Sequence, residues 1–381
     1  MKKNSISQTT TKKPRHRRRS KRNPTNLYLS AVPPSQTVGM DLGDKTSRYC
    51  VLDQAGAIQK EGSTPTTKKG MTQTFAQMAR SRVSIEVGTH SAWVSRLLAS
   101  FGHEVIVANA RRVRAISDSN CKDDRMDAQL LARLARVDPA LLYPIRHRGQ
   151  QAQQHLAMIR ARAALVDGRT ALVNTARGLV KSFGERLGKC DTDQMGVEKL
   201  SHLPAEEQAA LRPLLETVAA LTEHIQEYDQ QIAEIARKHY PETALLEQVS
   251  GVGQLIALTF ILTLEDKDRF ERSRDVGAYL GLRPKRKDSG ESQPELGITK
   301  EGDVYLRRLL VQGAHCILSV RGPDTDLKRW GVKLAARGGK KAKKKAVVAV
   351  ARKLGILLHH LWATGEVYEP LRQSQAQAAV A

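Results

Sequence analysis

Four carboxylates in the first 140 residues of this 381-residue chain stand at positions that side-chain packing does not readily explain. Asp41 lies in the short strand-like run 37–43, and Glu86 lies in a second such run, 83–87. Asp124 and Asp127 are three residues apart, which would place both on one side of a helix. The chain that carries them has a formal net charge of +23. A basic protein that concentrates acids in this way is equipped to hold Mg²⁺ against a phosphate backbone.

Clustered carboxylates repel one another, and the repulsion raises their pKa values unless cations lie between them. Two divalent cations roughly 4 Å apart would remove that penalty, one activating an attacking oxygen and the other stabilising the leaving oxygen of a phosphodiester. Oxygen ligands alone favour Mg²⁺, or Mn²⁺, over zinc. We therefore expect all four acids to be metal ligands and catalytic residues.

Each acid also has a purely structural alternative. Asp41 could start a turn, Glu86 could be an exposed strand residue, Asp124 could lie near a helix N-cap, and Asp127 could pair with Arg125 or Arg133. The metal site is favoured because the four acids occur together and in the topological order that one site requires.

The elements around these acids predict a mixed α/β domain at residues 37–148. Strand patterns at 37–43, 48–53 and 57–62, joined by turns, predict an antiparallel meander. The expected elements that follow are a helix over 67–80, a strand over 83–87, a helix over 91–101, a strand over 104–107, and helices over 111–116 and 123–136. Strands interleaved with helices indicate a sheet with parallel members that is covered on its faces. The order βββαβαβα is that of an RNase H-like domain.

The rest of the chain has helical patterns, so the fold class is α/β plus all-α. Residues 149–242 are nearly free of strand signals and predict a helical hairpin or coiled-coil arm. A C-terminal domain over 243–330 opens with a turn that contains Gly251 and Gly253, and a helix is expected over 303–318. Such a turn can offer backbone N–H groups to a phosphate, although many helix turns need glycine for positive φ. A basic tail, 331–381, carries Lys340, Lys341, Lys343, Lys344 and Lys345 before an apolar helix over 346–362.

Lysines and arginines number 62 against 39 aspartates and glutamates, an excess that indicates a polyanionic partner. Nucleic acid is favoured over a membrane surface, and no apolar run approaches the roughly 20 residues needed to span a bilayer. Residues 1–36 hold ten Lys or Arg and no acid, so we expect a disordered arm that binds nucleic acid non-specifically, with a targeting peptide as the alternative. The four cysteines are scattered, which indicates a reducing compartment and no zinc site.

Short segments of the predicted RNase H-like domain, at 39–43, 85–91 and 122–132, resemble the DEDD domain of IS110-family transposases, the IS1111 group included. Segments at 249–253, 281–284, 288–290, 299–303 and 306–310 are similar to the C-terminal transposase domain of that family. Each motif alone is weak, but their ordered combination over residues 37–330 is specific.

The resemblance implies a RuvC-like DEDD site, a coiled-coil arm, and a serine in the C-terminal domain that attacks DNA to form a covalent phosphoserine intermediate. By position that serine is Ser289, and Ser292 is the alternative. The resemblance also implies a homo-oligomer, a dimer or tetramer, whose protomers share a site, and a structured guide RNA that selects donor and target DNA. It further implies a bacterial cytoplasmic protein associated with the nucleoid. The basic arm before Asp41 is longer than this family leads us to expect.

The leading hypothesis is thus a DNA transposase-recombinase that combines Mg²⁺ carboxylates with Ser289. A RuvC-type nuclease without covalent chemistry is the second hypothesis, and a non-enzymatic nucleic-acid-binding protein is the third. The basic side chains expected to bind backbone phosphates near the nucleophile are Lys285, Arg286, Lys287, Lys300, Arg307 and Arg308.

Overall fold

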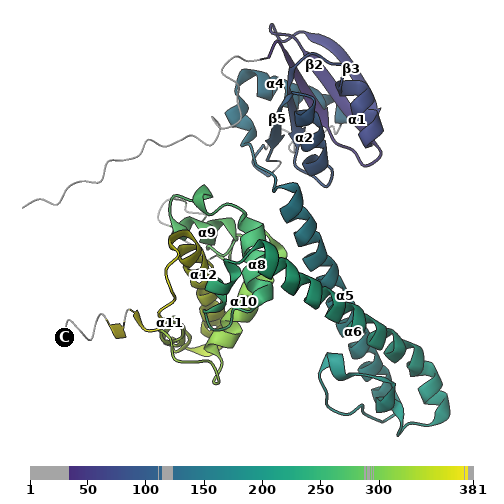
Figure 1. Ribbon diagram of the computed structural model, residues 1–381, viewed down its shortest axis with the longest axis vertical. Helices are drawn as coiled ribbons and strands as arrows, with labels where there is room; N and C mark the ends of the chain where they lie inside the picture. The colour runs from purple at the N-terminus through teal and green to yellow at the C-terminus, as the bar shows by residue number, and fades with distance from the viewer. Residues whose placement is uncertain are drawn as a thin grey trace, which may run out of the picture. The chain divides into compact units, whose positions relative to one another are not determined.

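The computed structural model describes residues 34–109, 111–113, 123–286, 289, 292, 294, 296–372 and 374–375. By its internal contacts the chain divides into two units, Met1–His147 and Arg148–Ala381 (Figure 1). The basic arm expected at 1–36 lies almost wholly outside the described residues, and so does most of the helix expected at 111–116.

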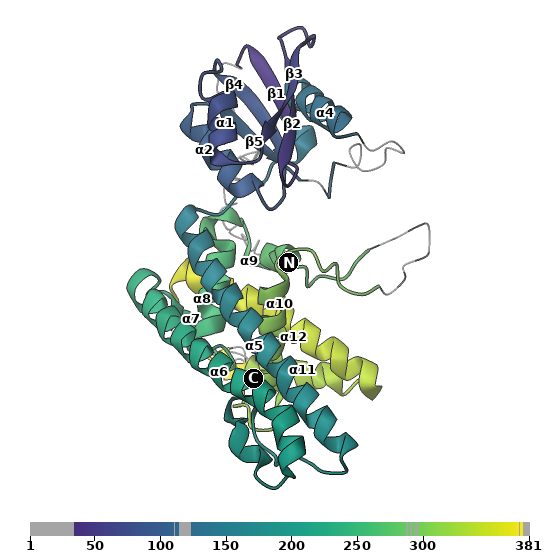
Figure 2. The same cartoon turned by 90° about the vertical axis from the view of Figure 1, so that its right-hand side faces the viewer.

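A mixed five-stranded sheet with the order β3-β2-β1-β4-β5 organises the first unit (Figure 2). β1 pairs antiparallel with β2, as β2 does with β3, whereas β1–β4 and β4–β5 are parallel pairs. The predicted meander and the parallel members are therefore confirmed. The strands are β1 (Gln36–Asp41), β2 (Thr46–Leu52), β3 (Ile58–Pro65), β4 (Ser81–Glu86) and β5 (Glu104–Ala108).

Helices cover both faces of this sheet, as the sequence predicts. The first face packs against α1 (Lys68–Phe75) and α2 (Ser91–Ser100), whose apolar side chains share one core with those of β1, β2 and β4. The second face packs against α4 (Asp124–Val137), and the turn Pro139–Leu142 follows that helix. The described elements have the order βββαβαβα, which is compatible with an RNase H-like domain.

The alternation of side chains along each strand decides which residues meet α4. In β1, Val38 and Met40 belong to the core beneath α1 and α2. Because successive side chains point to opposite faces, Gly39 and Asp41 lie on the side of α4. In β4 the same alternation puts Glu86 on that side.

The second unit begins with two long helices, α5 (Gln150–Ser182) and α6 (Ala205–His239), which run side by side as a hairpin (Figures 1 and 2). Short 3₁₀ turns at Thr192–Gln194 and Val197–Leu200 lie between them. Buried α5 residues recur at spacings of three and four, the pattern by which paired helices interlock. They include Leu156, Ile159, Ala163, Val173, Ala176 and Val180. The predicted helical hairpin is therefore confirmed.

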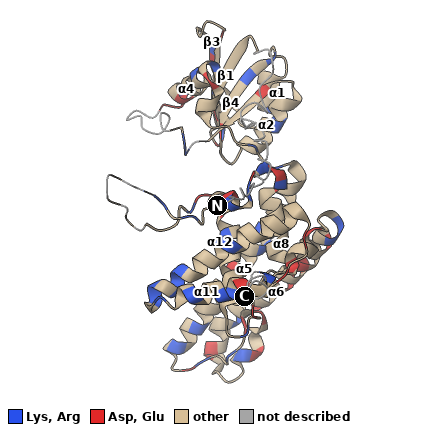
Figure 3. Cartoon of the chain, turned by 90° about the vertical axis from the view of Figure 1, so that its left-hand side faces the viewer, with Lys and Arg blue, Asp and Glu red and all other residues tan. Residues whose placement is uncertain are grey.

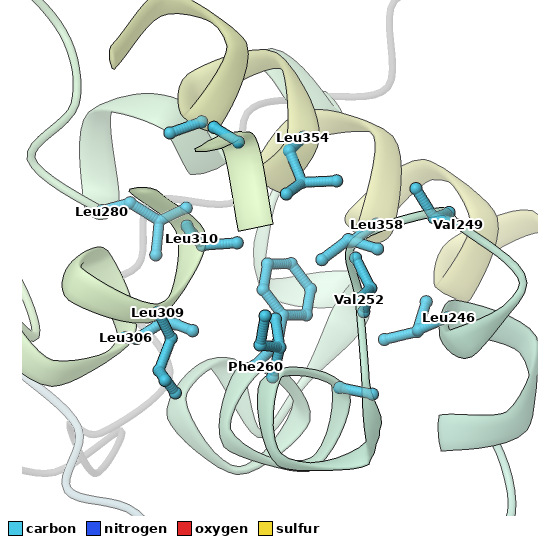
Figure 4. Packing of buried hydrophobic residues seen from close by; sticks show 14 of the residues in the cluster. Leu246, Val249, Val252, Phe260, Leu280, Leu306, Leu309, Leu310, Leu354 and Leu358 are labelled. Carbon is cyan, nitrogen blue, oxygen red and sulfur yellow. The ribbon is translucent and has the colours of Figure 1, made fainter. Parts of the chain in front are cut away.

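The C-terminal part of this unit is an all-helical bundle. Its helices are α7 (Thr243–Glu247), α8 (Gln254–Leu264), α9 (Ser273–Tyr279), α10 (Val304–Leu318), α11 (Asp326–Ala335) and α12 (Gly339–Thr364). α8 is buried over nearly its whole circumference, as an apolar helix with no polar face must be. Its Phe260 lies at the centre of the core, and the labelled side chains around it in Figure 4 include Leu310 and Leu358.

Two ion pairs attach the arm to this bundle. The Nη2 atom of Arg160 on α5 lies 2.6 Å from Oδ2 of Asp303, which is also the N-cap of α10. Seven residues along α5, Asp167 accepts hydrogen bonds from Nη1 of Arg308 on α10, at 3.1 and 3.0 Å. Residues seven apart lie on the same face of a helix, so α5 is held to α10 at two points along one edge.

α12 begins earlier than the sequence predicts. The lysines expected before an apolar helix at 346–362 lie within the helix, which begins at Gly339. Lysine is a good helix former, whereas Gly338 and Gly339 have positive φ angles of 110° and 66°, so the turn comes before the lysines. Contrary to expectation, α12 is long and apolar enough to be considered for a membrane span by length and composition. Half of its apolar window is buried in the fold, as in a core helix.

Candidate active site

Two of the predicted acids end neighbouring parallel strands. Asp41 is the last residue of β1 and Glu86 is the last residue of β4. The two strands are in direct register up to Met40 and Ile85, so Asp41 and Glu86 are the next opposed positions at the same sheet edge. Since both side chains lie on the α4 side of the sheet, the strands alone bring this pair together.

α4 brings the other two acids to the same edge. Asp124 and Asp127 lie in its first turn, and Asp123 caps the helix by accepting a hydrogen bond from the Arg125 amide at 3.0 Å. Gly39 allows α4 to approach, because a Cβ atom there would lie 2.0 Å from the Ala128 carbonyl oxygen. No residue larger than glycine fits at this strand position without moving the helix.

Buried polar side chains fix α4 against the sheet. The Ser84 hydroxyl donates toward the carbonyl oxygens of Val38, at 3.1 Å, and Leu131, at 3.0 Å, and so joins β4, β1 and α4. Arg82 pairs with Glu104 across β4 and β5 at 2.5 Å, and its Nη1 donates to a carbonyl of α4 at 3.3 Å. This role of Ser84 is not among the sequence predictions, although a polar residue inside an apolar strand run is a signal for it.

Electrostatics show that the four acids are neighbours. The pKa of Asp41 is raised to about 6, first by burial and then by the nearby charges of Asp124, Asp127 and Glu86, while a backbone hydrogen bond from Leu42 acts in the opposite direction. The pKa of Glu86 is raised as well, by burial and then by Asp127. A buried carboxylate among other carboxylates is destabilised unless a proton or a cation is added.

These acids suit a divalent cation by donor chemistry, since all four offer hard oxygen ligands and their mutual repulsion would be relieved by positive charge. Among the described residues, however, no three His, Cys, Asp or Glu side chains already surround a common point as metal ligands do. The four acids therefore lie near one another, but their side chains are not arranged as a complete metal coordination sphere.

A histidine near the same strand ends was not anticipated. The Trp93 indole N–H donates to Nδ1 of His90 at 3.1 Å, and His90 Nε2 lies 3.4 Å from Oδ1 of Asp44. Because an indole can only donate, Nδ1 must accept, which leaves the proton on Nε2 facing Asp44. The only sequence signal was the position of this histidine four residues after Glu86.

One structural alternative for Asp127 can be compared with the structure directly. Arg125, proposed as its partner, instead donates from Nε to Glu61 of β3 at 2.9 Å. Gln129 of α4 donates to the same carboxylate at 2.7 Å. Glu61 thus receives the donors of α4 that point toward β3, and Arg125 is engaged away from the acidic edge.

In the second unit, both candidate nucleophiles lie at the end of an extended loop. Ser289 and Ser292 are exposed and exchange backbone hydrogen bonds, with N···O distances of 3.2 and 3.0 Å. Further backbone hydrogen bonds connect the two sides of the loop, from Lys285 to Gly297, from Thr299 to Arg283, and from Lys300 to Gly281. The polar loop predicted after Arg283 is therefore a hairpin-like projection with the two serines opposite each other near its tip.

The predicted phosphate-binding residues have different surroundings. Lys285, Arg286 and Lys300 are exposed on the projection, and Lys287 lies outside the described residues. Arg307 donates to the carbonyl oxygens of Leu280, at 3.2 Å, and Glu301, at 3.1 Å, so it supports the base of the projection. Arg308 pairs with Asp167 and lies over the Tyr305 ring. The last two guanidinium groups thus have contacts within the fold.

The two glycines of the predicted turn differ in role. Gly251 has a φ of 81°, and a Cβ there would lie 2.7 Å from the Gly313 carbonyl oxygen, so packing against α10 explains this glycine. Gly253 is the N-cap of α8, and a Cβ there would meet nothing within 4 Å. Nothing packs against Gly253, so the backbone at the start of α8 is open to solvent. Phosphate binding at Gly253 therefore stays a prediction, as it does for the exposed basic residues.

Comparisons with known proteins match both units. A transposase model for the DEDD domain of IS110-type elements matches residues 38–184, and a model described as "Transposase IS116/IS110/IS902 family" matches residues 243–328. The transposase for insertion sequence element IS1111A of Coxiella burnetii is 28% identical, over 87% of this chain and 90% of that protein. A probable family 20 transposase of Pseudomonas aeruginosa is 30% identical, over 78% and 88%. The transposase for IS1328 of Yersinia enterocolitica is 28% identical, over 74% and 84%.

Two matched domains in the same order, together with relatives aligned over most of their length, set aside the non-enzymatic hypothesis. An enzyme of this kind acts on DNA, which accounts for the excess of basic residues. The chain belongs to the IS110 family of transposases and is a DNA transposase-recombinase.

Proposed function

We propose that this transposase cuts and rejoins DNA with two groups from its two units. Asp41, Glu86, Asp124 and Asp127 would hold divalent cations, Mg²⁺ or Mn²⁺, and Ser289 would be the nucleophile. The observation that carries the proposal is the position of the four acids at one sheet edge, where β1 and β4 end and α4 begins. Their mutual repulsion, which helps to raise the pKa of Asp41, would be relieved by bound cations. A DEDD transposase domain itself implies dependence on a divalent metal.

The bond changes follow from the chemistry of a serine ester. Divalent cations bound by the acids would lower the charge on the phosphodiester and stabilise the leaving oxygen. Ser289 Oγ would attack the phosphorus, forming an Oγ–P bond while the P–O bond to the leaving strand breaks. The leaving oxygen takes up a proton in place of the one that the serine hydroxyl loses. A hydroxyl of the strand to be joined then attacks the phosphoserine and restores Ser289.

The exposure of Ser289 supports its assignment. A serine needs a base or a metal nearby to become nucleophilic, and the tip of a projection can be presented to groups from another part of the assembly. We propose that the acids of one protomer and Ser289 of another complete one site, in a dimer or tetramer. Ser292, paired with Ser289 across the tip, remains the alternative nucleophile.

Basic residues of the projection suit the DNA backbone next to the nucleophile. Lys285, Arg286 and Lys300 are exposed there, and we include Lys287 on sequence grounds. We further propose that a structured RNA of the element guides the choice of donor and target DNA, a load with which the net charge of +23 is consistent.

A covalent-trapping experiment tests this proposal. The protein would be incubated with cognate DNA, its flanking RNA and Mg²⁺, then denatured and analysed for protein–DNA adducts. We expect an adduct that is lost in Ser289→Ala and kept in Ser292→Ala. Asp41→Asn should lose the adduct as well, because the acids and the serine act in the same step. If the adduct were instead lost in Ser292→Ala and kept in Ser289→Ala, Ser292 would be the nucleophile.

Metal-dependent strand cleavage without a covalent intermediate is the second candidate, because the four acids alone could serve a two-metal hydrolysis. It predicts cleavage that survives Ser289→Ala and disappears in Asp41→Asn. The covalent-trapping experiment distinguishes the two mechanisms, since only the covalent mechanism leaves DNA attached to the denatured protein.

A further inference from the structure

The α11–α12 hairpin ends in cations that packing does not account for. The sequence from 327 to 365 contains eleven Lys or Arg and no Asp or Glu. Some of them serve the fold: Arg329 pairs with Asp324, and Lys353 lies 4.0 Å from the centre of the Trp330 ring. Exposed cations gather where α11 ends and α12 begins (Figure 3). We call six of them the lysine tip: Lys333, Arg337, Lys340, Lys341, Lys343 and Lys344.

The lysine tip is built on a rigid support. A Cβ atom at Gly331 of α11 would lie 2.6 Å from side-chain atoms of both Leu318 on α10 and Val350 on α12. The three helices therefore meet closely just behind the tip, and Leu354 continues the contact into the bundle core. The cations are held in place by a packed scaffold.

Their position is unfavourable for the helix that carries them. The N-terminal turn of a helix has a partial positive charge and favours acids, yet the first turn of α12 contains none and has no side-chain N-cap. Lysines three and four residues apart, such as Lys340 with Lys344, repel one another. In the part of the chain that the structure describes, no ion pair joins the six cations to an acid. The arrangement is understandable if an external anion supplies the missing charge.

We infer that the lysine tip binds the phosphate backbone of duplex DNA, an inference that deepens the proposed function. At about 100° per residue, the lysines from Lys340 to Lys344 point to both sides of the helix end. Such a spread suits the two phosphate rows that border a B-DNA major groove about 12 Å wide. The major groove of A-form RNA is too deep and narrow to admit a helix end in this way.

The composition of the tip also defines the kind of contact. Residues 331–350 contain no aromatic side chain on which an unpaired base could stack, so single strands are disfavoured. They also contain no Asn or Gln and a single arginine, Arg337. Few side chains of the tip can therefore form the hydrogen bonds that distinguish one base from another. The lysine tip is thus a non-specific backbone contact. It lies beyond residue 328, where the matched C-terminal family model ends.

Binding of a scrambled-sequence DNA duplex to the full-length protein tests the inference. Fluorescence anisotropy would be measured without divalent metal and in a Ser289→Ala background, so that strand chemistry plays no part. We expect Lys340→Gln, Lys341→Gln and Lys344→Gln together to weaken binding about tenfold near 100 mM salt, and to reduce the salt slope by about 2 to 3. The corresponding Arg variants should retain binding because they retain the charge.

The matched control removes the same charge elsewhere: Lys60→Gln, Lys68→Gln and Lys69→Gln, all exposed on β3 and α1. An equal loss in this control, or no loss in the tip variant, would overturn the inference. So would a tip variant that loses affinity for an RNA duplex but not for DNA. Thermal unfolding guards against misfolding, and the tip variant should melt no lower than the parent since it loses helix-terminal repulsion. Failure of covalent trapping would leave this binding result unaffected.

Discussion

Gly39 and Ala128 approach so closely that a Cβ atom on Gly39 would lie 2.0 Å from the Ala128 carbonyl oxygen. This contact joins the central strand β1 to the first half of α4. On one side of it, Asp41 ends the strand, and on the other, Asp124 and Asp127 begin the helix. The spacing of the acidic site therefore depends on a backbone contact that no acid makes.

Gly39→Ala should destabilise the first unit severely. The added methyl group meets backbone atoms, which cannot rotate away as a side chain can, so we expect a loss of about 3 kcal/mol or more in the free energy of unfolding. Urea denaturation measures it. Gly88→Ala is the control, because a Cβ atom there meets nothing within 4 Å. Similar losses in both variants would show that glycine flexibility, and not contact with α4, is what matters.

Asp41→Asn should stabilise the metal-free protein at neutral pH. The folded-state pKa of Asp41, about 6, lies above its ordinary value of about 4, so the folded state holds this proton more tightly. The stability contribution is complete below pH 4 and is lost as the pH rises through 6. In chelator at pH 7 we expect Asp41→Asn to gain about 1–3 kcal/mol, allowing for partial solvent screening, and little at pH 4. A constant difference across this pH range would contradict the assignment.

Divalent metal should stabilise the protein in a pH-dependent manner. Mg²⁺ competes with the proton of Asp41, so its effect on unfolding should grow between pH 5 and 7.5. At ten times its dissociation constant it should add about 1.4 kcal/mol. Thermal melts with Mg²⁺ and with chelator give the measurement. Asp41→Asn should abolish the effect, whereas Asp44→Asn, an exposed neighbour, should keep it.

Asp303→Ala should loosen the joint between the arm and the bundle. Asp303 accepts the Leu306 amide hydrogen bond at 2.9 Å and pairs with Arg160 while only 7% exposed, so its loss removes a helix cap and a shielded ion pair. We expect a loss of about 2–3 kcal/mol by urea denaturation. Asp167→Ala removes an ion pair whose carboxylate is 60% exposed, and should lose less than about 1 kcal/mol. Equal effects would mean that the cap contributes little.

The sequence predicts much of the first unit because its signals are local. Alternation along β1 and β4 identifies the strands and places Asp41 and Glu86 near their ends, and helical spacing pairs Asp124 with Asp127. The contact that brings these pairs together could not be read from spacing. The role of Gly39 depends on a helix some ninety residues away in the sequence.

Basic residues were harder to interpret than acids. Arg307 and Arg308 share a motif and a helix with the expected DNA-binding face, yet their partners are carbonyl groups and an acid from distant segments. A positive charge in the sequence does not indicate whether a folded partner will meet it. The start of α12 differs from the predicted one for a related reason, because lysine favours helices and the lysine run therefore lies inside α12 and not before it.

The two ion pairs at Arg160 and Asp167 give the outer part of α5 a fixed length, measured from its attachment to the bundle. A helix fixed to its base at two points seven residues apart can neither swing nor rotate freely there. The fifteen residues that follow Asp167, up to Ser182, then extend about 22 Å beyond the second point, at 1.5 Å per residue. Removing one turn from both α5 and α6 would shorten that reach by about 5.4 Å while leaving every acid, serine and lysine of the proposals in place. The number of residues in the arm thus sets the distance between the bundle and the outer end of the arm. Any assembly that forms through that outer end has its spacing set by the same distance.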